Sequence, residues 1–265
     1  LHAVRQYQTD RDPKEKLLSF KRCLTHFAVD TEQVLMSTKL SGLKTYFLPF
    51  NKGYKESLPA APNACLPAIH RQAAQAGAGT PPVCVQRTGR LVEGKYKTHY
   101  LWEDVWSKSS VLDLVSRFIQ DVWEEKELPN GKKVKENKLI FPRYHQLDTV
   151  RRLIADAREH GPGRNYLIQH SAGSGKSNTI AWASHRLSEL HDEHDQKVFD
   201  GVVVITDRRV LDRQLSETVE SFAQVKGVVK HVESSAELRE ALEKGTRIIT
   251  STLQKFPVIV ESIDA

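Results

Sequence analysis

The feature that most constrains this chain is a glycine-rich segment, residues 170–177, which reads His-Ser-Ala-Gly-Ser-Gly-Lys-Ser. The apolar run at 166–168 predicts a short buried strand before it, and the spacing after it predicts a helix over 176 to about 190. A glycine-rich turn between strand and helix points backbone N–H groups inward, and the helix N-terminus adds a partial positive charge. The segment therefore predicts a nucleoside triphosphate site, with ATP as the expected ligand. The alternative is a Gly/Ser turn that only caps a helix.

The residues of this loop have separate predicted roles. Lys176 would bring a full positive charge to the β and γ phosphates, and the Ser177 hydroxyl would bind Mg²⁺ held by ATP. These two residues are also the candidate catalytic residues of the chain. The candidate cofactor-binding residues of the loop are Ala172, Gly173, Ser174, Gly175, Lys176 and Ser177.

Around the loop, predicted helices and strands alternate. The predicted elements are a helix at 143–158, strands at 201–206, from 228, and at 247–250, and helices at 209–222 and 236–242. Alternation at this period is typical of an α/β fold, in which a parallel sheet is covered by helices on both faces.

The first half of the chain has a different character. Short β-type runs at 23–29, 33–36 and 44–50 are separated by turn residues and predict an antiparallel meander within residues 1–55. Residues 56–94 are rich in Ala, Pro and Gly and predict a loop or insertion of poor order.

Residues 95–138 predict a helical connector. The apolar residues between 111 and 122 have helical spacing, and a polar turn at 130–133 follows them. We expect the α/β domain to occupy residues 139–265.

Polar residues follow two of the predicted strands. Arg208 and Arg209 come directly after one strand, and Thr252, Gln254 and Lys255 follow another. Ligands of open α/β sheets bind at the carboxyl edge of the strands, so these five residues are candidate contacts to the phosphates of DNA. Each run by itself is more typical of a solvated helix cap, and it is the presence of two such runs on one predicted edge that favours contact with DNA.

Arg143 and Gln146 open the helix that precedes the loop and are further candidate cofactor-binding residues. The side-chain amide of Gln146 has a donor and an acceptor that match an adenine edge. The alternative is an ordinary surface glutamine.

Composition adds limits on location and partners. The net charge of +6 fits a polyanionic partner and fits a solvated surface equally well. Three cysteines without metal-ligand spacing are typical of free thiols in the cytoplasm. No apolar run reaches the roughly 18 residues of a membrane span, so no membrane association is expected. Because the chain starts at Leu1 and ends without a closing element, we expect an internal fragment of a longer protein.

The ordered series of motifs resembles the restriction (R) subunit of type I restriction–modification enzymes. The segments that carry the resemblance are 22–30, 47–53, 141–147, 169–177, 204–208 and 252–256. His170 stands where the general phosphate loop begins with Gly, a position that helicase-type loops relax. Gln146 resembles the adenine-reading Gln of superfamily 2 helicases. The loop alone is generic, whereas the order of the segments is specific to the family.

The resemblance implies the rear part of an α+β restriction-endonuclease-like domain in residues 1–55, and a first RecA-like motor domain with its phosphate loop in 139–265. It also implies ATP-dependent translocation of double-stranded DNA coupled to endonucleolytic cleavage. Separate methyltransferase and specificity subunits would be its partners.

The chain also departs from the family pattern. The family's acidic residue and Glu-x-Lys have no convincing copy, and Gln6 matches the family Gln but is followed four residues later by Asp10 instead of Tyr. The acidic pair of the ATPase site would lie beyond Ala265, so we expect this fragment alone neither to cut DNA nor to hydrolyse ATP at a useful rate. Two alternatives stay open: a DEAD/DEAH-like helicase or remodelling ATPase without a nuclease, and a non-catalytic nucleotide-binding module.

Overall fold

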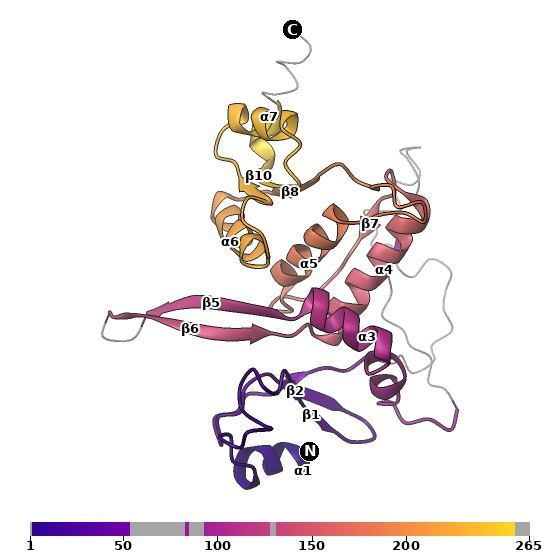
Figure 1. Cartoon of the computed structure of the whole chain (residues 1–265), viewed down its shortest axis with the longest axis vertical. Coiled ribbons are helices and arrows are strands. Elements are labelled where there is room, and N and C mark those ends of the chain that lie inside the picture. Colours follow the sequence, from indigo (N-terminus) through magenta and orange to yellow (C-terminus); the bar gives the residue numbers. More distant parts are fainter. Residues whose placement is uncertain (1, 54–82, 85–92, 128–130, 258–265) are drawn as a thin grey trace. The chain divides into compact units, whose positions relative to one another are not determined.

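The computed structural model describes residues 2–53, 83–84, 93–127 and 131–257 (Figure 1). The chain forms two compact units. Unit 1 comprises residues 1–78 and 86–148, and unit 2 comprises residues 79–85 and 149–265. The division falls inside helix α4 (Tyr144–His160), downstream of the boundary expected at 139. None of the helices in the described ranges is long and apolar enough to cross a membrane.

Unit 1 begins with a short helical stretch and the predicted meander. The elements are α1 (His2–Arg5), η1 (Gln6–Asp10), β1 (His26–Val29), β2 (Val34–Ser37) and β3 (Leu48–Pro49). The strands pair antiparallel in the order β1-β2-β3, which confirms the meander. The carboxylate of Asp30 closes the first turn, because its Oδ1 accepts hydrogen bonds from the backbone of Glu32 at 2.8 Å and of Gln33 at 2.7 Å.

The segment predicted as a helical connector is helical only in its first part. Its elements are η2 (Leu101–Val105), α3 (Lys108–Asp113), η3 (Leu114–Phe118), β5 (Gln120–Glu127) and β6 (Lys133–Ile140). The helical prediction is therefore wrong from Gln120 onward, where β5 and β6 pair as an antiparallel hairpin. Cross-strand pairing is the physical reason: Val122 lies opposite Lys138 in the register, and Lys138 forms an ion pair with Glu124 of the partner strand. Asn130-Gly131 is the hairpin signal that the helical interpretation missed.

An aromatic cluster forms much of the core of unit 1. Phe50 packs against Phe27 with ring centroids 5.3 Å apart and against Tyr144 at 5.8 Å. Tyr144 also meets Tyr100 at 4.8 Å, and the Tyr100 hydroxyl donates to the backbone oxygen of Phe50 at 2.7 Å. These contacts join the meander to the first turn of α4, so the Arg143–Gln146 segment begins on a buried support.

Unit 2 contains the predicted parallel sheet and its helices. The elements are α5 (Lys176–Ser188), β8 (Val202–Thr206), α6 (Arg209–Ser221), β9 (Val229–His231), α7 (Ser235–Glu243), β10 (Ile248–Thr252) and the 3₁₀ turn η4 (Leu253–Lys255). The strands are parallel in the order β8-β10-β9. Figure 1 shows α6 and α7 on opposite sides of this sheet, which confirms the α/β arrangement with helices on both faces.

The strand before the loop has an unexpected partner. Among the described residues, β7 (Tyr166–Leu167) pairs in parallel only with β4 (Val83–Cys84) and not with the three-stranded sheet. The loop prediction for 56–94 is thus wrong at Val83–Cys84, where a short β-prone run follows two prolines. Residues 56–82 and 85–92 of that prediction lie outside the described residues.

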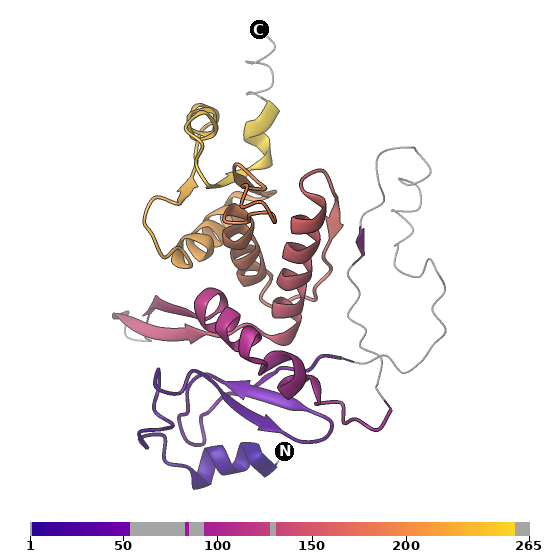
Figure 2. The same ribbon diagram turned by 45° about the vertical axis from the view of Figure 1, so that its right-hand side comes forward.

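Helix α5 is fixed to unit 2 by an aromatic contact. Trp182 is 1% exposed and packs against Phe222 with ring centroids 5.2 Å apart. Nearby, His185 Nε2 lies 2.8 Å from the backbone oxygen of Val219. Figure 2 shows α5 beside α6 after a turn of the view. The helix that begins at Lys176 is therefore packed against α6 from its middle onward.

Candidate functional site

The loop between β7 and α5 has the backbone that its glycines predict. Gly173 has φ 70°, and Gly175, which precedes the first turn of α5, has φ 79° and ψ 39°. Both lie in the left-handed region, which costs a residue with a Cβ about 1–2 kcal/mol. A Cβ added at Gly173 would meet no atom within 4 Å, so the space beside the loop is open. The loop and its two glycines fit a phosphate group on this evidence.

Lys176 lies across the loop. Its ammonium donates to the backbone oxygen of Ser171 at 2.9 Å and reaches that of His170 at 3.4 Å. The side chains of Lys176 and Ser177 are both exposed at the start of α5. A bound phosphate would replace weak carbonyl acceptors with anionic oxygens, and this exchange strengthens the hydrogen bonds of the ammonium.

The departure at position 170 has a structural counterpart. His170 Nε2 lies 3.3 Å from the hydroxyl of Thr149 on α4, and Thr149 is buried. A glycine has no side chain with which to make this contact. Within unit 2, His170 therefore ties the first residue of the loop to α4.

A polar clamp fixes the start of β7 to the end of α4. The Tyr166 hydroxyl donates to Asp156 Oδ2 at 2.7 Å, and the Arg164 guanidinium donates to Asp156 Oδ1 at 3.1 Å. The hydrogen bond from Tyr166 lowers the pKa of Asp156; burial opposes this shift, and the charge of Arg164 adds to it. Burial, together with that same hydrogen bond, raises the pKa of Tyr166 to about 12. The strand that leads into the loop is thus anchored by side chains on both sides of the turn.

We expect Tyr166 to ionise later than the ordinary tyrosine in an alkaline titration. Because the pKa of Tyr166 is raised in the folded chain, the stabilisation from its hydrogen bond to the Asp156 carboxylate is not reduced by phenol ionisation below pH 10.0 and is lost as the pH rises toward about 12. The absorbance of tyrosinate, compared between the wild type and Tyr166→Phe, isolates this phenol. A difference curve centred near the ordinary value would contradict the clamp.

Arg143 and Gln146 form the start of α4. Gln146 is 3% exposed, and its side-chain oxygen accepts a hydrogen bond from the backbone N–H of Arg143 at 2.8 Å. The amide oxygen therefore caps the helix, because the first N–H groups of a helix have no partner within it. The adenine-reading role of Gln146 stays a prediction.

The two polar runs after β8 and β10 meet at one edge. Thr252 pairs in register with Thr206, so both strands end at the same level. The side-chain amide of Gln254 donates to the backbone oxygen of Asp207 at 3.1 Å. Arg208 is exposed and directly precedes α6. The structure thus brings the two predicted runs together.

The other candidate DNA contacts have structural neighbours. Thr252 is 3% exposed, and the Lys255 ammonium donates to the backbone oxygen of Val232. The side chain of Arg209 lies outside what the structure describes. Contact of these residues with DNA stays a prediction.

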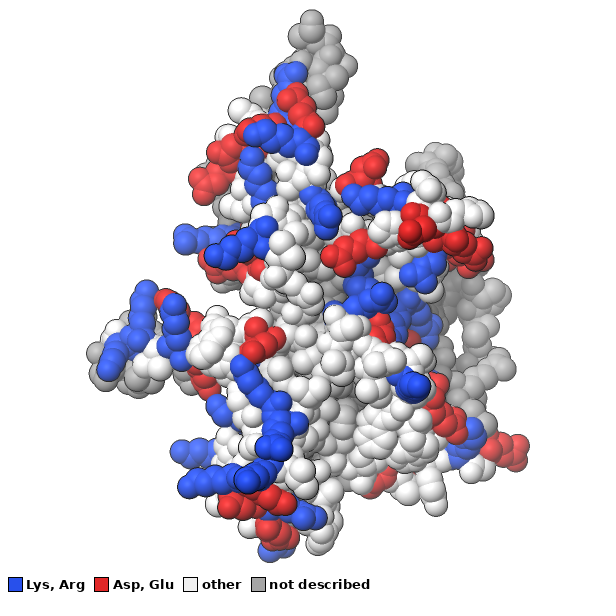
Figure 3. Space-filling model, in the orientation of Figure 1, with Lys and Arg blue, Asp and Glu red and all other residues white. Residues whose placement is uncertain are grey.

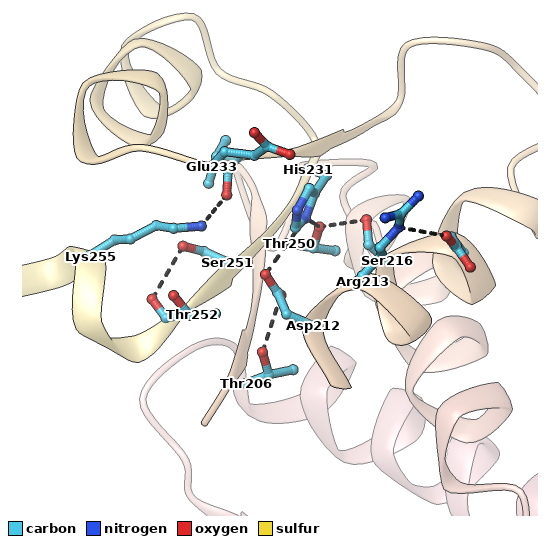
Figure 4. Close-up of polar contacts among 12 residues, drawn as sticks. Thr206, Asp212, Arg213, Ser216, His231, Glu233, Thr250, Ser251, Thr252 and Lys255 are labelled. Atoms are coloured by element: carbon cyan, nitrogen blue, oxygen red, sulfur yellow. Dashed lines mark hydrogen bonds and ion pairs between the residues drawn. The ribbon is translucent and has the colours of Figure 1, made fainter. Parts of the chain in front are cut away.

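A buried polar network lies under α6, as Figure 4 shows. The Thr206 hydroxyl donates to Asp212 Oδ1 at 3.1 Å, and His231 Nδ1 lies 3.8 Å from Asp212 Oδ2. His231 Nδ1 is also 3.1 Å from the hydroxyl oxygen of Thr250, which donates to Ser216 at 2.9 Å. Sequence reasoning missed Asp212, Ser216 and His231. The helical spacing of positions 212, 216 and 219 is the one local signal that could have placed the first two on the buried face.

A resident metal site is a separate question from the Mg²⁺ carried by a nucleotide. In the described part of the chain, no group of three or more His, Cys, Asp or Glu side chains could hold a metal ion. The Ser177 hydroxyl at the start of α5 remains the candidate ligand of nucleotide-bound Mg²⁺.

Comparison with known proteins gives two similarities. The family model for the SWI2/SNF2 ATPase matches residues 145–264. The type I restriction enzyme SsaAORF53P endonuclease subunit of Staphylococcus saprophyticus is 33% identical over 128 residues, which is 48% of this chain and 13% of that protein. The SauCOLORF180P endonuclease subunit of Staphylococcus aureus (strain COL) is 32% identical over 124 residues, which is 46% of this chain and 12% of that protein.

The match thus covers 12–13% of the length of these relatives. The family resemblance inferred from the motifs is confirmed: over about half of its length, this chain is similar to the endonuclease subunits of type I restriction enzymes.

Proposed function

We propose that this chain is the ATP-binding part of a type I restriction enzyme endonuclease subunit, with a RecA-like motor domain over residues 139–265. The observation that carries the proposal is the loop between β7 and α5, with two left-handed glycines and the Lys176 ammonium above its carbonyls. The SWI2/SNF2 ATPase match over residues 145–264 supports ATP use by the same part of the chain. The similarity to endonuclease subunits supports the restriction context.

The chain's own groups would act on the nucleotide in three ways. Successive backbone N–H groups of the loop and of the first turn of α5 would bind phosphate oxygens. Lys176 would neutralise charge on the β and γ phosphates, and the Ser177 hydroxyl would hold the Mg²⁺ that accompanies ATP. Mg²⁺, when bound, supplies charge stabilisation between the phosphates.

In the full-length protein, the proposed activity is ATP-dependent translocation of double-stranded DNA coupled to endonucleolytic cleavage. Methyltransferase and specificity subunits are the proposed partners. Residues 1–55, which contain the antiparallel meander, are proposed as the rear part of the nuclease-like domain. A second candidate, a remodelling-type ATPase without a nuclease, is favoured by the SWI2/SNF2 match. Nicking of plasmid DNA by the full-length protein separates the two.

The proposal is tested by competition between ATP and GTP for the site. We expect the chain to bind a fluorescent ATP analogue, and ATP to displace it better than GTP by roughly 2- to 10-fold, because one or two neutral hydrogen bonds read the base. Gln146→Glu keeps the acceptor for the Arg143 N–H but removes the amide donor, so this variant should lose the preference while α4 keeps its cap.

Gln214→Ala, an exposed position on α6, is the matched control and should behave as the wild type. An unchanged ATP/GTP ratio in Gln146→Glu would show that Gln146 only caps α4. A wild-type chain that binds neither nucleotide would overturn the proposed function itself.

A further inference from the structure

The face of α6 that packs on the sheet is polar near its beginning. Asp212 is 3% exposed, Ser216 4% and Thr250 of the central strand 1%. Sheets that are covered by helices on both faces normally bury apolar side chains there. A buried carboxylate is costly unless it is paired and hydrogen-bonded, so the partners of Asp212 must hold it in one geometry.

Asp212 spans the central strand of the sheet. One carboxylate oxygen accepts from Thr206, the last residue of β8, and the other lies near His231, the last residue of β9 (Figure 4). Strand β10 lies between these two strands. A single side chain on the first turn of α6 therefore contacts the carboxyl ends of both outer strands.

The loop between β8 and α6 is held at three successive residues. The Thr206 side chain donates to Asp212, and the backbone N–H of Asp212 donates to the backbone oxygen of Arg208 at 2.9 Å. Between them, the backbone oxygen of Asp207 accepts from Gln254 at 3.1 Å. This short loop is therefore fixed from α6 on one side and from η4 on the other.

Arg208, which this loop carries, has a charge that is available to an anion. It is exposed, and it forms no ion pair with any residue that the structure describes. By contrast, Arg213 on the next turn of α6 pairs with Glu217 at 3.2 Å, and Lys230 pairs with Glu240 at 3.5 Å. On the face that Figure 3 shows, Lys and Arg are interspersed with Asp and Glu and form no uniform positive surface.

We propose that Gln254 and Asp212 are positioning residues that hold Arg208 against a backbone phosphate of DNA. The inference rests on the proposed function, because DNA is the partner that it assumes. It also separates the candidate DNA contacts into residues that touch the phosphate and residues that position them. Gln254 acts through the Asp207 carbonyl, Thr252 is buried, and Lys255 donates to a backbone oxygen. Among the candidates whose side chains the structure describes, Arg208 therefore carries the phosphate contact of this edge.

The test is a double-mutant cycle on DNA affinity. A short fluorescein-labelled duplex is titrated with the purified chain, and the dissociation constant is measured by anisotropy over a range of salt concentrations. Arg208→Ala should lower the slope of log affinity against log salt by about 0.9, the loss of one phosphate contact. Gln254→Ala should produce most of the same loss, and the double variant should lose nothing further, because both act through one contact.

Thr206→Val provides a second, independent release of the loop. Valine has the shape of threonine and suits a strand, but it cannot donate to Asp212. This variant avoids the larger cost of removing the buried carboxylate and should also lower the slope without adding to Arg208→Ala. Ser216→Ala breaks the far end of the network without touching the loop, and it should leave the slope unchanged. Melting curves of all variants establish that they fold.

Each outcome decides something different. If the double variant Gln254→Ala/Arg208→Ala lost more of the slope than Arg208→Ala alone, Gln254 would contact DNA itself. The positioning role would then be wrong. A wild-type slope in Arg208→Ala would also overturn the inference, while DNA binding by the chain would stand. A wild-type chain with no salt-dependent affinity for the duplex would refute the DNA-binding part of the proposed function instead.

Discussion

Lys176→Ala is expected to weaken ATP binding roughly 10- to 150-fold. The estimate corresponds to the loss of one charge-assisted contact, about 1.5–3 kcal/mol. The ammonium of Lys176 lies over the loop, on the backbone oxygens of Ser171 and His170, and no other residue of 170–177 carries a full positive charge. Its removal leaves the phosphates with backbone dipoles alone. Titration of a fluorescent ATP analogue measures the change.

Two further variants make this result specific. Lys226→Ala removes the same charge from an exposed position in unit 2 and should leave the affinity unchanged. Lys176→Arg keeps the charge but replaces a compact ammonium with a wide planar group, so it should recover only part of the affinity. Equal affinity of Lys176→Ala and the wild type would show that the loop does not bind phosphate and only caps α5.

Elements with a regular period could be predicted from the sequence. The helix predicted at 209–222 is α6 (Arg209–Ser221), and the strand predicted at 201–206 is β8 (Val202–Thr206). The apolar residues of α6 repeat at the spacing of one buried face, whereas those of β8 form a continuous run, and both signals are local. The left-handed glycines of the loop follow from the same kind of local reasoning.

The hairpin and the partner of β7 could not be predicted in this way. Charged residues such as Glu124 and Lys138 occupy β5 and β6, and they resemble a solvated helix face as closely as a strand. Strand β4 pairs with β7 across more than eighty residues of sequence, as Val83 and Tyr166 show. Pairing over such a separation depends on the whole chain and leaves no pattern in a short window.

In the candidate site, too, the local features could be predicted and the long-range contacts could not. The loop and the edge of the sheet were located from strand and helix ends, but the direction of each side chain there was not. The sequence predicts that Gln254 contacts DNA, whereas in the structure its amide donates to the backbone oxygen of Asp207. Asp212 follows β8 and His231 ends β9, and they approach each other because β10 is the only strand between β8 and β9 in the sheet that the structure describes. No local pattern in the sequence encodes this strand order.

Trp182→Ala is expected to lower the free energy of unfolding by about 3–5 kcal/mol, the largest stability effect we predict. Trp182 is 1% exposed, and its ring packs against Phe222 at the contact between α5 and α6. Removal of the indole leaves a large cavity between two helices that support the candidate nucleotide and DNA sites. Denaturation by urea, followed by far-UV circular dichroism, measures the loss.

Trp102→Ala is the matched control, because it removes the same side chain from a position that is 45% exposed on η2. We expect it to change the free energy of unfolding by less than about 1 kcal/mol. Trp182→Phe keeps an aromatic ring against Phe222 and should recover most of the stability. If Trp182→Ala were no more destabilising than Trp102→Ala, α5 would not be fixed by this contact. The orientation of Lys176 and Ser177 at its start would then need another support.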